Sequence, residues 1–273
     1  MTKSLFSKCL VLVLVVLTVL FVGCKSDPEI KDDATKITVA ASPTPHAEIL
    51  KICVPLMEEK GYTLEIKEFS DYVIPNTATE EGEVNANYFQ HTPYLNDFNA
   101  ENGTHLVSVG AVHYEPFGIY AGTSSDLSVK TGLKIAVPND TTNEARALLL
   151  LEQEGFITLK EGAGLTATKV DIVEFNGNEI VELEAAAIAQ ARPDCNLVVL
   201  NGNYAIGAGL KVKDALAIES ATGPAATTYA NVLVVHECNK EKTIIKALLE
   251  CLQSEEVKTY IQNTYEGSVV PMF

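Results

Sequence analysis

Short apolar runs alternate with amphipathic segments along most of the chain. Residues 37–41, 134–137 and 197–200 are mostly apolar runs of strand length, and residues 63–69 alternate as a half-buried strand does. Apolar spacing predicts helices at 47–60, although Pro55 disfavours continuation there, and at 143–154. Further strands are predicted at 106–109, 118–120, 170–173 and 232–235, and further helices at 242–253 and 255–263. Strands that alternate with helices predict an α/β protein with parallel sheets.

Two of these strands begin in the same way. Residues 36–40 read Lys-Ile-Thr-Val-Ala and residues 134–138 read Lys-Ile-Ala-Val-Pro, and each run leads through a turn into a helix. They are candidates for the first strands of two α/β lobes. Ligands of open α/β sheets bind beyond the carboxyl ends of the strands, so a cleft between two lobes is a natural binding site. The alternative is one continuous sheet without a cleft.

The N-terminus has the pattern of an export signal. Lys3 and Lys8 precede the apolar run 9–23, which only Thr18 interrupts, and fifteen residues fall short of the roughly 20 that span a bilayer. Leu-Phe-Val-Gly then precedes Cys24, which resembles a bacterial lipobox, with Phe21 where leucine is usual. We predict a signal peptide at 1–23, acylation of Cys24 and a location at the outer face of the cell membrane. A cleaved signal without acylation is the alternative.

Residues 24–35 are polar and acidic, as expected of a flexible lipidated tether, so folding should begin near Lys36. The net charge is −16, and removal of a signal with two lysines and no acid changes it to about −18 (−16 minus 2). Nucleic acid is thereby excluded as a partner, because phosphate binding needs a basic surface.

Conventional catalytic and metal-binding signatures are missing. The sequence contains no HExxH, GxSxG, P-loop or GxGxxG motif, and its histidines never pair at i, i+4. The cysteines after Cys24 have wide spacing without a CxxC pair, so they are expected to be buried apolar residues, with one disulfide bridge as the alternative; they are Cys53, Cys195, Cys238 and Cys251. We therefore expect no catalytic residue, no cofactor and no metal.

Arg146 is the first candidate ligand residue. It follows the strand-to-helix segment 137–145, in which Thr142 or Asn143 is placed to cap the helix, and it is expected in the first helical turn. The helix dipole disfavours a cation there, and a ligand carboxylate would offset that cost through a bidentate contact. The alternative is a surface arginine paired with Glu144 or another acid.

Aromatic side chains cluster in residues 69–76 and 86–95, in loop-like surroundings beside proline and asparagine. A wall of rings suits an apolar or thioether side chain, since sulfur packs favourably against aromatic rings. These rings could equally be core residues, and the histidine among them a structural one. The members of the predicted wall are Tyr72, Phe89, His91 and Tyr94.

Asparagines stand where two predicted strands end or begin. Asn201 and Asn203 follow the strand 197–200, and Asn231 precedes the strand 232–235. A neutral amide can donate to a carboxylate and accept from an ammonium, which suits a zwitterion. Asn201 and Asn203 could instead serve a turn, whereas Asn231 requires partners to be accommodated at a strand.

These segments together resemble a known family from about Lys36 to Phe273. The motifs are ASPTPHAEIL at 41–50, FSDYVIPN at 69–76, NANYFQHTPYL at 85–95, VPNDTTNEARALLLL at 137–151, NGNYAIGAGL at 201–210 and YANVLVV at 229–235. They are similar to those of the NlpA-type methionine-binding lipoproteins, the substrate-binding components of bacterial ABC importers.

The resemblance implies a two-lobed, periplasmic-binding-protein-like (type II) fold with a ligand cleft. Lobe 1 would comprise residues 36–118 and 229–273, and lobe 2 residues 119–228, with crossings near 117–122 and 229–232. It also implies amino-acid capture, most often of L-methionine, and delivery to an ABC permease with its ATPase. Arg146 would bind the carboxylate, and Asn201 and Asn231 the amino and carboxylate groups. The aromatic wall would surround the side chain.

Two other functional classes remain as alternatives. An enzyme on the same scaffold would need a nucleophile or an acid–base pair, for which only His91 and Asp71 are candidates. A surface adhesin or antigen lipoprotein would keep the lipid anchor and bind another ligand or none.

Overall fold

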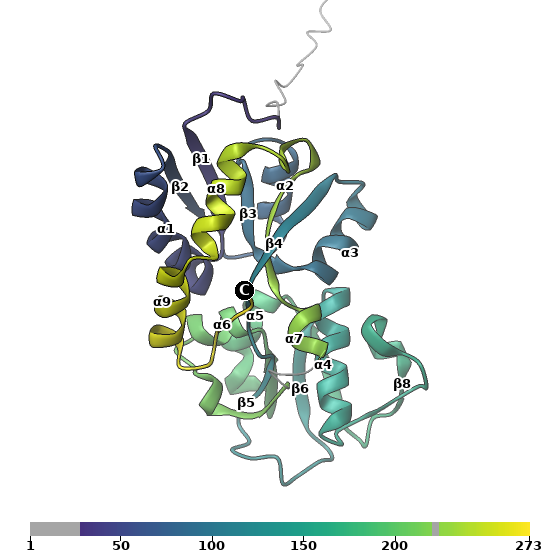
Figure 1. The fold of residues 1–273 in the computed structure, drawn as a ribbon. Helices are drawn as coiled ribbons and strands as arrows, with labels where there is room; N and C mark the ends of the chain where they lie inside the picture. The colour runs from purple at the N-terminus through teal and green to yellow at the C-terminus, as the bar shows by residue number, and fades with distance from the viewer. Residues whose placement is uncertain (1–27, 220–223) are drawn as a thin grey trace, which may run out of the picture.

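The computed structural model describes residues 28–219 and 224–273 (Figure 1). The predicted signal peptide and Cys24 lie outside these residues. One six-stranded sheet has the order β13-β4-β12-β3-β1-β2. Its strands are β1 (Lys36–Ala41), β2 (Thr63–Glu68), β3 (Ala86–His91), β4 (Leu106–Tyr114), β12 (Asn231–His236) and β13 (Val270–Pro271).

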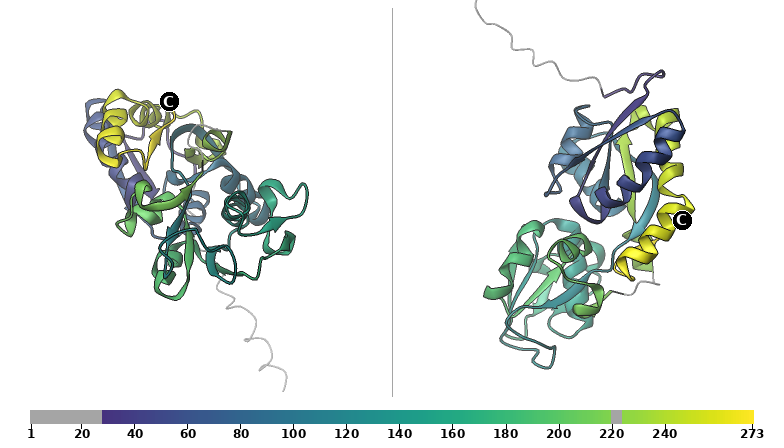
Figure 2. Two further views of the ribbon diagram at one scale, coloured as in Figure 1. Left: turned by 90° about the horizontal axis from the view of Figure 1, so that it is seen from below. Right: turned by 90° about the vertical axis from the view of Figure 1, so that its left-hand side faces the viewer.

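A second sheet of five strands has the order β11-β5-β10-β6-β9, and β7 and β8 form a separate pair. The five strands are β5 (Gly118–Ala121), β6 (Lys134–Pro138), β9 (Glu179–Leu183), β10 (Leu197–Leu200) and β11 (Ala215–Ile218), and the pair is β7 (Thr158–Leu159) with β8 (Ile172–Glu174). The predicted alternative of one continuous sheet is therefore wrong. We call the six-stranded sheet with its helices lobe 1 and the five-stranded sheet with its helices lobe 2; the right-hand view of Figure 2 shows them apart.

Both sheets are mixed rather than parallel as predicted. β1 is parallel to β2 and β3, and β6 is parallel to β9 and β10, as expected of strand–helix–strand units. In contrast, β12 runs antiparallel to β3 and β4, and β5 runs antiparallel to β10 and β11. The antiparallel strands belong to the two connections between the lobes, β4 to β5 and β11 to β12. The chain leaves the six-stranded sheet after β4 and returns to it in β12, so these neighbouring strands run in opposite directions. In the same way, it enters the five-stranded sheet in β5 and leaves it after β11.

Helices cover the faces of each sheet (Figure 1). Lobe 1 carries the short turn η1 (Pro43–Ala47) and the helices α1 (Glu48–Glu59), α2 (Ile74–Glu80), α3 (Thr92–Asn102), α8 (Thr243–Leu252) and α9 (Glu255–Tyr265). Lobe 2 carries α4 (Thr141–Gln153), α5 (Ala185–Ile188), α6 (Gly202–Gly207) and α7 (Pro224–Thr228). α1 continues through Pro55, because this proline lies on the exposed face while Cys53 and Met57 are buried.

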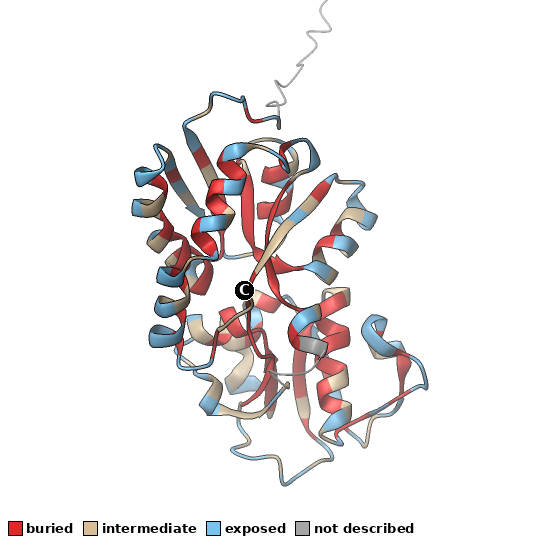
Figure 3. Cartoon of the chain, viewed as in Figure 1, coloured by how far each residue is buried: buried red, intermediate tan, exposed pale blue. Residues whose placement is uncertain are grey.

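Each lobe has its own apolar core, and buried segments concentrate in the strands and the inner faces of the helices (Figure 3). In lobe 1, α1 and α8 pack on β1 through residues such as Ile49, Leu248 and Val39. In lobe 2, α4 packs on β6 through Leu148 and Ile135. Two separate cores leave the boundary between the lobes to be lined by other, largely polar, side chains.

Residues 69–95 are more regular than the loop-like surroundings predicted for the aromatic cluster. They contain α2, β3 and the start of α3. All six residues of β3 are buried, because the strand lies between β1 and β12. Its polar Asn87 is accommodated by Asn76 and Thr79, whose side-chain oxygens accept its Nδ2 hydrogens at 3.0 and 2.8 Å. Because some buried residues of β3 are polar, the sequence lacks the alternation of apolar and polar positions that marks a strand.

The predicted tether is fixed to lobe 1 from Pro28 onward. Ile30 is only 4% exposed and joins the lobe 1 core. Its backbone N donates to Asn239 Oδ1 at 2.8 Å, and Asn239 Nδ2 donates to Pro28 O at 2.6 Å. Lys242 forms ion pairs with Glu29 and Asp32. The expectation of a flexible segment extending to residue 35 is therefore wrong, because one apolar side chain and one amide hold it.

Replacing Asn239 by alanine is expected to lower the free energy of unfolding by about 1–3 kcal/mol, since it leaves a buried backbone N–H without its acceptor. Urea titration measures the loss, and limited proteolysis should show faster cleavage before Lys36. The exposed Asn263 provides the control, and Asn263→Ala should change stability by less than about 0.5 kcal/mol. Equal stability of the two variants would contradict the role of Asn239 in holding residues 28–34 against lobe 1.

Candidate ligand-binding site

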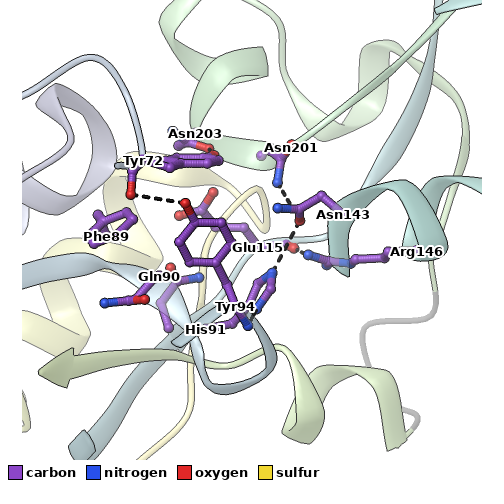
Figure 4. A pocket seen from close by; sticks show the side chains of 12 residues that line it. Tyr72, Phe89, Gln90, His91, Tyr94, Glu115, Asn143, Arg146, Asn201 and Asn203 are labelled. Atoms are coloured by element: carbon purple, nitrogen blue, oxygen red, sulfur yellow. Dashed lines mark hydrogen bonds between the residues drawn. The ribbon is translucent and has the colours of Figure 1, made fainter. Parts of the chain in front are cut away.

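A narrow pocket lies at the boundary between the lobes (Figure 4). It contains all seven residues predicted to bind the ligand: Tyr72, Phe89, His91, Tyr94, Arg146, Asn201 and Asn231. Four further residues line the pocket that were not predicted to bind the ligand, namely Gln90, Glu115, Asn143 and Gly202, together with Asn203, for which an amide role and a turn role were both open. The free volume is about 20 Å³, which is room for one water molecule.

Aromatic rings from lobe 1 form one wall of the pocket. The ring centroid of Tyr72 lies 5.7 Å from that of Phe89 and 5.8 Å from that of Tyr94. Tyr204 of lobe 2 extends the wall, with its ring 5.0 Å from Tyr72. The Tyr72 hydroxyl donates to Asn203 Oδ1 at 2.6 Å across the lobe boundary. The wall offers an apolar surface whose polar edges are already satisfied.

His91 is a neutral donor in this pocket. Its Nδ1 accepts from Tyr94 N at 3.2 Å and so caps α3, which leaves the proton on Nε2. Nε2 lies 3.2 Å from Asn143 Oδ1 and donates to it. Burial, helped by the charge of Arg146, lowers the pKa of His91 to about 3. His91 therefore has a structural role as the cap of α3 and also lines the pocket.

Helix α4 begins two or three residues earlier than the predicted caps require. Asp140 is the N-cap, and its Oδ1 accepts from Asn143 N at 3.0 Å and from Asn143 Nδ2 at 2.8 Å. The prediction of Thr142 or Asn143 as the cap is wrong, and Arg146 lies in the second turn rather than the first. This register directs Asn143 into the pocket, where it connects His91 of lobe 1 with Asn201 of lobe 2.

Arg146 already has an anionic partner inside the protein. Its Nε lies 2.8 Å from both carboxylate oxygens of Glu219, and its Nη2 lies 2.6 Å from Glu219 Oε2. Nη2 also donates to Glu115 O at 2.9 Å. The alternative of pairing with an acid holds for Glu219 and not for Glu144, which accepts from Lys169 N, and Arg146 is buried rather than at the surface. The bonds that Arg146 makes to Glu219 and to the backbone of Glu115 use Nε and Nη2 and not Nη1.

Two of the four pocket asparagines, Asn201 and Asn231, have complementary amide groups without a hydrogen-bond partner among the described residues. Asn201 Nδ2 donates to Asn143 Oδ1 at 2.9 Å, while Asn201 Oδ1 is buried without a partner in the described part of the chain. Asn231 Oδ1 accepts from His46 Nε2 at 3.0 Å, and its Nδ2 makes no hydrogen bond to a described residue. The pocket thus presents one fixed acceptor and one fixed donor. An unpaired buried acceptor is costly unless a ligand satisfies it.

Glu115 lines the pocket from within a buried network. Its Oε1 accepts from His113 Nε2 at 2.7 Å, and His113 Nδ1 contacts the Tyr88 hydroxyl. Burial raises the pKa of Glu115 and lowers the pKa of His113 to about 3. A Cβ on Gly202 would lie 2.6 Å from Glu115 Cβ, so glycine is needed where α6 meets this network. The alternation of His113 and Glu115 at a strand end was the sequence signal that the prediction overlooked.

The two residues proposed for an enzyme are committed elsewhere. Asp71 Oδ1 accepts from Val73 N and Ile74 N, each at 2.8 Å, and therefore stabilises the turn before α2. Both nitrogens of His91 are engaged as described above. Neither side chain is free to act with the other as an acid–base pair.

Two α/β lobes joined by two crossings, with a polar and aromatic pocket at their boundary, define a two-lobed solute-binding protein. Residues 37–273 match the family model described as NlpA lipoprotein, and the chain belongs to this family.

Named relatives cover nearly the whole chain. The membrane lipoprotein TpN32 of Treponema pallidum is 40% identical over 93% of this chain and 94% of its own length. The methionine-binding lipoprotein MetQ of Bacillus subtilis is 38% identical over 99% of each chain.

Solved structures show the same architecture. A lipoprotein of Ruminococcus gnavus has a TM-score of 0.86 at 56% identity and covers 88% of this chain and 100% of its own. A nutrient-binding protein of Burkholderia cenocepacia, solved with methionine bound, has a TM-score of 0.82 at 39% identity and covers 87% and 100%.

Proposed function

We propose that this chain is an extracytoplasmic, lipid-anchored solute-binding protein that captures an amino acid, in the first instance L-methionine, and delivers it to an ABC permease and its ATPase. The observation that carries this proposal is the pair of free amide groups, Asn201 Oδ1 and Asn231 Nδ2, beside an aromatic wall. The methionine-binding relatives and the methionine-bound neighbour support the choice of ligand.

Each part of a methionine zwitterion has a matching group. The ammonium would donate to Asn201 Oδ1, which has no other partner among the described residues. The carboxylate would accept from Asn231 Nδ2 and Arg146 Nη1. The thioether would pack against Tyr72 and Phe89, since sulfur–aromatic contacts contribute about 0.3–1.5 kcal/mol. Recognition largely by neutral amides and a paired arginine avoids an excess of buried charge.

The described conformation is closed. Tyr72 bonds to Asn203 across the boundary, and the Tyr204 hydroxyl donates to Ser70 O at 2.9 Å. A free volume of about 20 Å³ does not admit an amino acid, so we propose that the lobes separate to receive and release it. The described residues proposed as hinge segments are 115–117, between β4 and β5, and 229–230, which precede β12.

We further propose that acylated Cys24 anchors the protein. None of the described helices is long and apolar enough to cross a membrane. Only Lys25, Ser26 and Asp27 separate Cys24 from Pro28, where the chain becomes fixed to lobe 1. Four residue steps span at most about 14 Å. Lobe 1 would therefore stay close to the bilayer, which keeps a closed, loaded protein within reach of a permease.

The direct test is to purify residues 25–273, denature the protein and identify any released small molecule by mass spectrometry. The ligand-free protein is then titrated calorimetrically with L-methionine, D-methionine and methionyl dipeptides. Stoichiometric methionine with submicromolar affinity is expected. No released ligand and no heat with any of these compounds would overturn the proposal and favour the adhesin alternative.

Asn231→Ala is expected to weaken methionine binding at least tenfold, about 1.4 kcal/mol, because it removes the free donor in the pocket. Calorimetry measures the change. Asn178, a buried amide of lobe 2 outside the pocket, provides a matched control. Asn178→Ala should lower stability and leave affinity unchanged. Unaltered affinity in Asn231→Ala would remove Asn231 from the site.

A further inference from the structure

A second cluster of potential ligand atoms lies at the surface of lobe 1, away from the pocket. Glu80 is the last residue of α2, His105 immediately precedes β4, and His236 is the last residue of β12. β4 ends and β12 begins at the inter-lobe crossings, so His105 and His236 lie at the opposite end of this sheet. The sequence spacing of the histidines indicated no metal ligands, but the antiparallel pairing of β4 with β12 brings these two together.

The atoms are arranged around a common point. Glu80 Oε1 lies 2.9 Å from His105 Nδ1 and 3.9 Å from His236 Nε2, and the three atoms lie within 4.8 Å of one another. Ligands at zinc distances of about 2.0–2.2 Å in a tetrahedral site are roughly 3.3 Å apart. Side-chain shifts of about 1 Å or less would therefore suffice.

Neighbouring groups orient two of the three ligands. Glu80 Oε2 accepts from His105 N at 2.8 Å, which directs Oε1 toward the imidazoles. His236 Nδ1 accepts from Cys238 N at 3.3 Å and lies 3.0 Å from Cys238 Sγ. Metal binding at His236 Nε2 would place the imidazole proton on Nδ1, so the long bond from Cys238 N would be exchanged for one that Nδ1 donates to this sulfur. Such outer contacts hold metal-binding histidines in place and typically change metal affinity 10- to 100-fold.

We propose that Glu80, His105 and His236 form a surface site for a divalent transition-metal ion, with Zn²⁺ as the first ion to test. Two imidazoles and one carboxylate favour zinc and its neighbours over Mg²⁺ and Ca²⁺, which prefer oxygen ligands. The His105 side chain is 59% exposed, so the ion can enter from solvent and retain water as a further ligand. Cys238 is exposed here, contrary to the prediction that the later cysteines are buried.

The test is a Zn²⁺ titration of untagged residues 25–273 after chelator treatment, with a competing metal indicator. One ion per chain is expected, with affinity reduced at least tenfold in His105→Asn and in His236→Asn. Glu237→Gln removes a neighbouring acid outside the cluster and should change affinity less than threefold. Zinc binding that is equal in wild type and in the double histidine variant would overturn the proposal.

Two further measurements separate metal binding from folding and from thiol chemistry. Methionine titration of each variant should match wild type, because the cluster is remote from the pocket, and this would show that the variants are folded. Cys238→Ser should retain one zinc ion, with affinity reduced less than in the histidine variants. If Cys238→Ser alone abolished binding while both histidine variants kept it, the proposed ligand set would be wrong.

Discussion

Arg146→Ala is expected to lower the free energy of unfolding by about 3–5 kcal/mol and to abolish methionine binding. Arg146 is 4% exposed and the Glu219 side chain 12%, and three contacts of 2.6–2.8 Å join them. Removing one member of a buried ion pair leaves the other charge without compensation, which typically costs this amount. The Nη1 donor proposed for the ligand carboxylate is lost at the same time.

A double variant separates these two consequences. Arg146→Met with Glu219→Gln removes both charges, and replacement of a buried pair by groups of similar volume is often close to neutral for stability. Urea unfolding should therefore recover most of the loss, while calorimetry should still detect no binding. Arg192→Ala, at the chain's other arginine, is the control and should retain affinity. Restored binding in the double variant would exclude Arg146 as a carboxylate ligand.

Lowering the pH from 7 to 4 is expected to destabilise the protein by several kcal/mol. Burial lowers the pKa of His46 to about 4 and the pKa values of His91 and His113 to about 3, from an ordinary value of 6.5. The unfolded chain therefore takes up these protons first. Stability contributed by the neutral imidazoles is present above pH 6.5 and is lost as the pH falls toward the folded-state values. Each histidine contributes on the order of 3 kcal/mol across this window.

Glu115, Asp140 and Glu144 oppose this trend, because burial raises their pKa values and the folded protein takes up those protons first. The pKa shifts of the three histidines are the larger ones, so a net loss of stability is expected. Thermal unfolding followed by circular dichroism at pH 7, 6, 5 and 4 measures it. His113→Gln should reduce the pH dependence. His105→Asn should not, since Glu80 raises the pKa of that exposed histidine. A melting temperature that is constant from pH 7 to 4.5 would contradict the expectation.

Much of the architecture was accessible from local patterns. The strand 197–200 and the helices α1, α8 and α9 were predicted to within about two residues, because their apolar spacing is regular. β3 and α3 were missed. In β3 the polar residues Asn87 and Gln90 are buried beside amide partners on α2 and on the strand itself, which removes the alternation that marks a strand.

In the pocket, too, local sequence patterns predicted some features and long-range contacts decided others. Residue types and motifs identified the seven predicted pocket residues, since aromatic rings, asparagines and one arginine are unusual in their local settings. The hydrogen-bond and ion-pair partners of those residues could not be predicted from the sequence. Glu219 is 73 positions from Arg146, and His46 is 185 positions from Asn231. Contacts over such separations depend on how two sheets are placed against each other, and no local pattern records that placement.

The sequence alone determined the alternation of strands and helices, the membership of the family and the chemical types of the pocket residues, because each depends on short-range periodicity or contiguous motifs. Tertiary structure decided the mixed direction of the strands in each sheet, the attachment of residues 28–34 to lobe 1 and the ion pair of Arg146 with Glu219. It also decided which asparagine atoms stay free in the pocket and which histidines meet at the far end of lobe 1. These features depend on hydrogen bonds and charges between segments that only folding brings within a few ångströms.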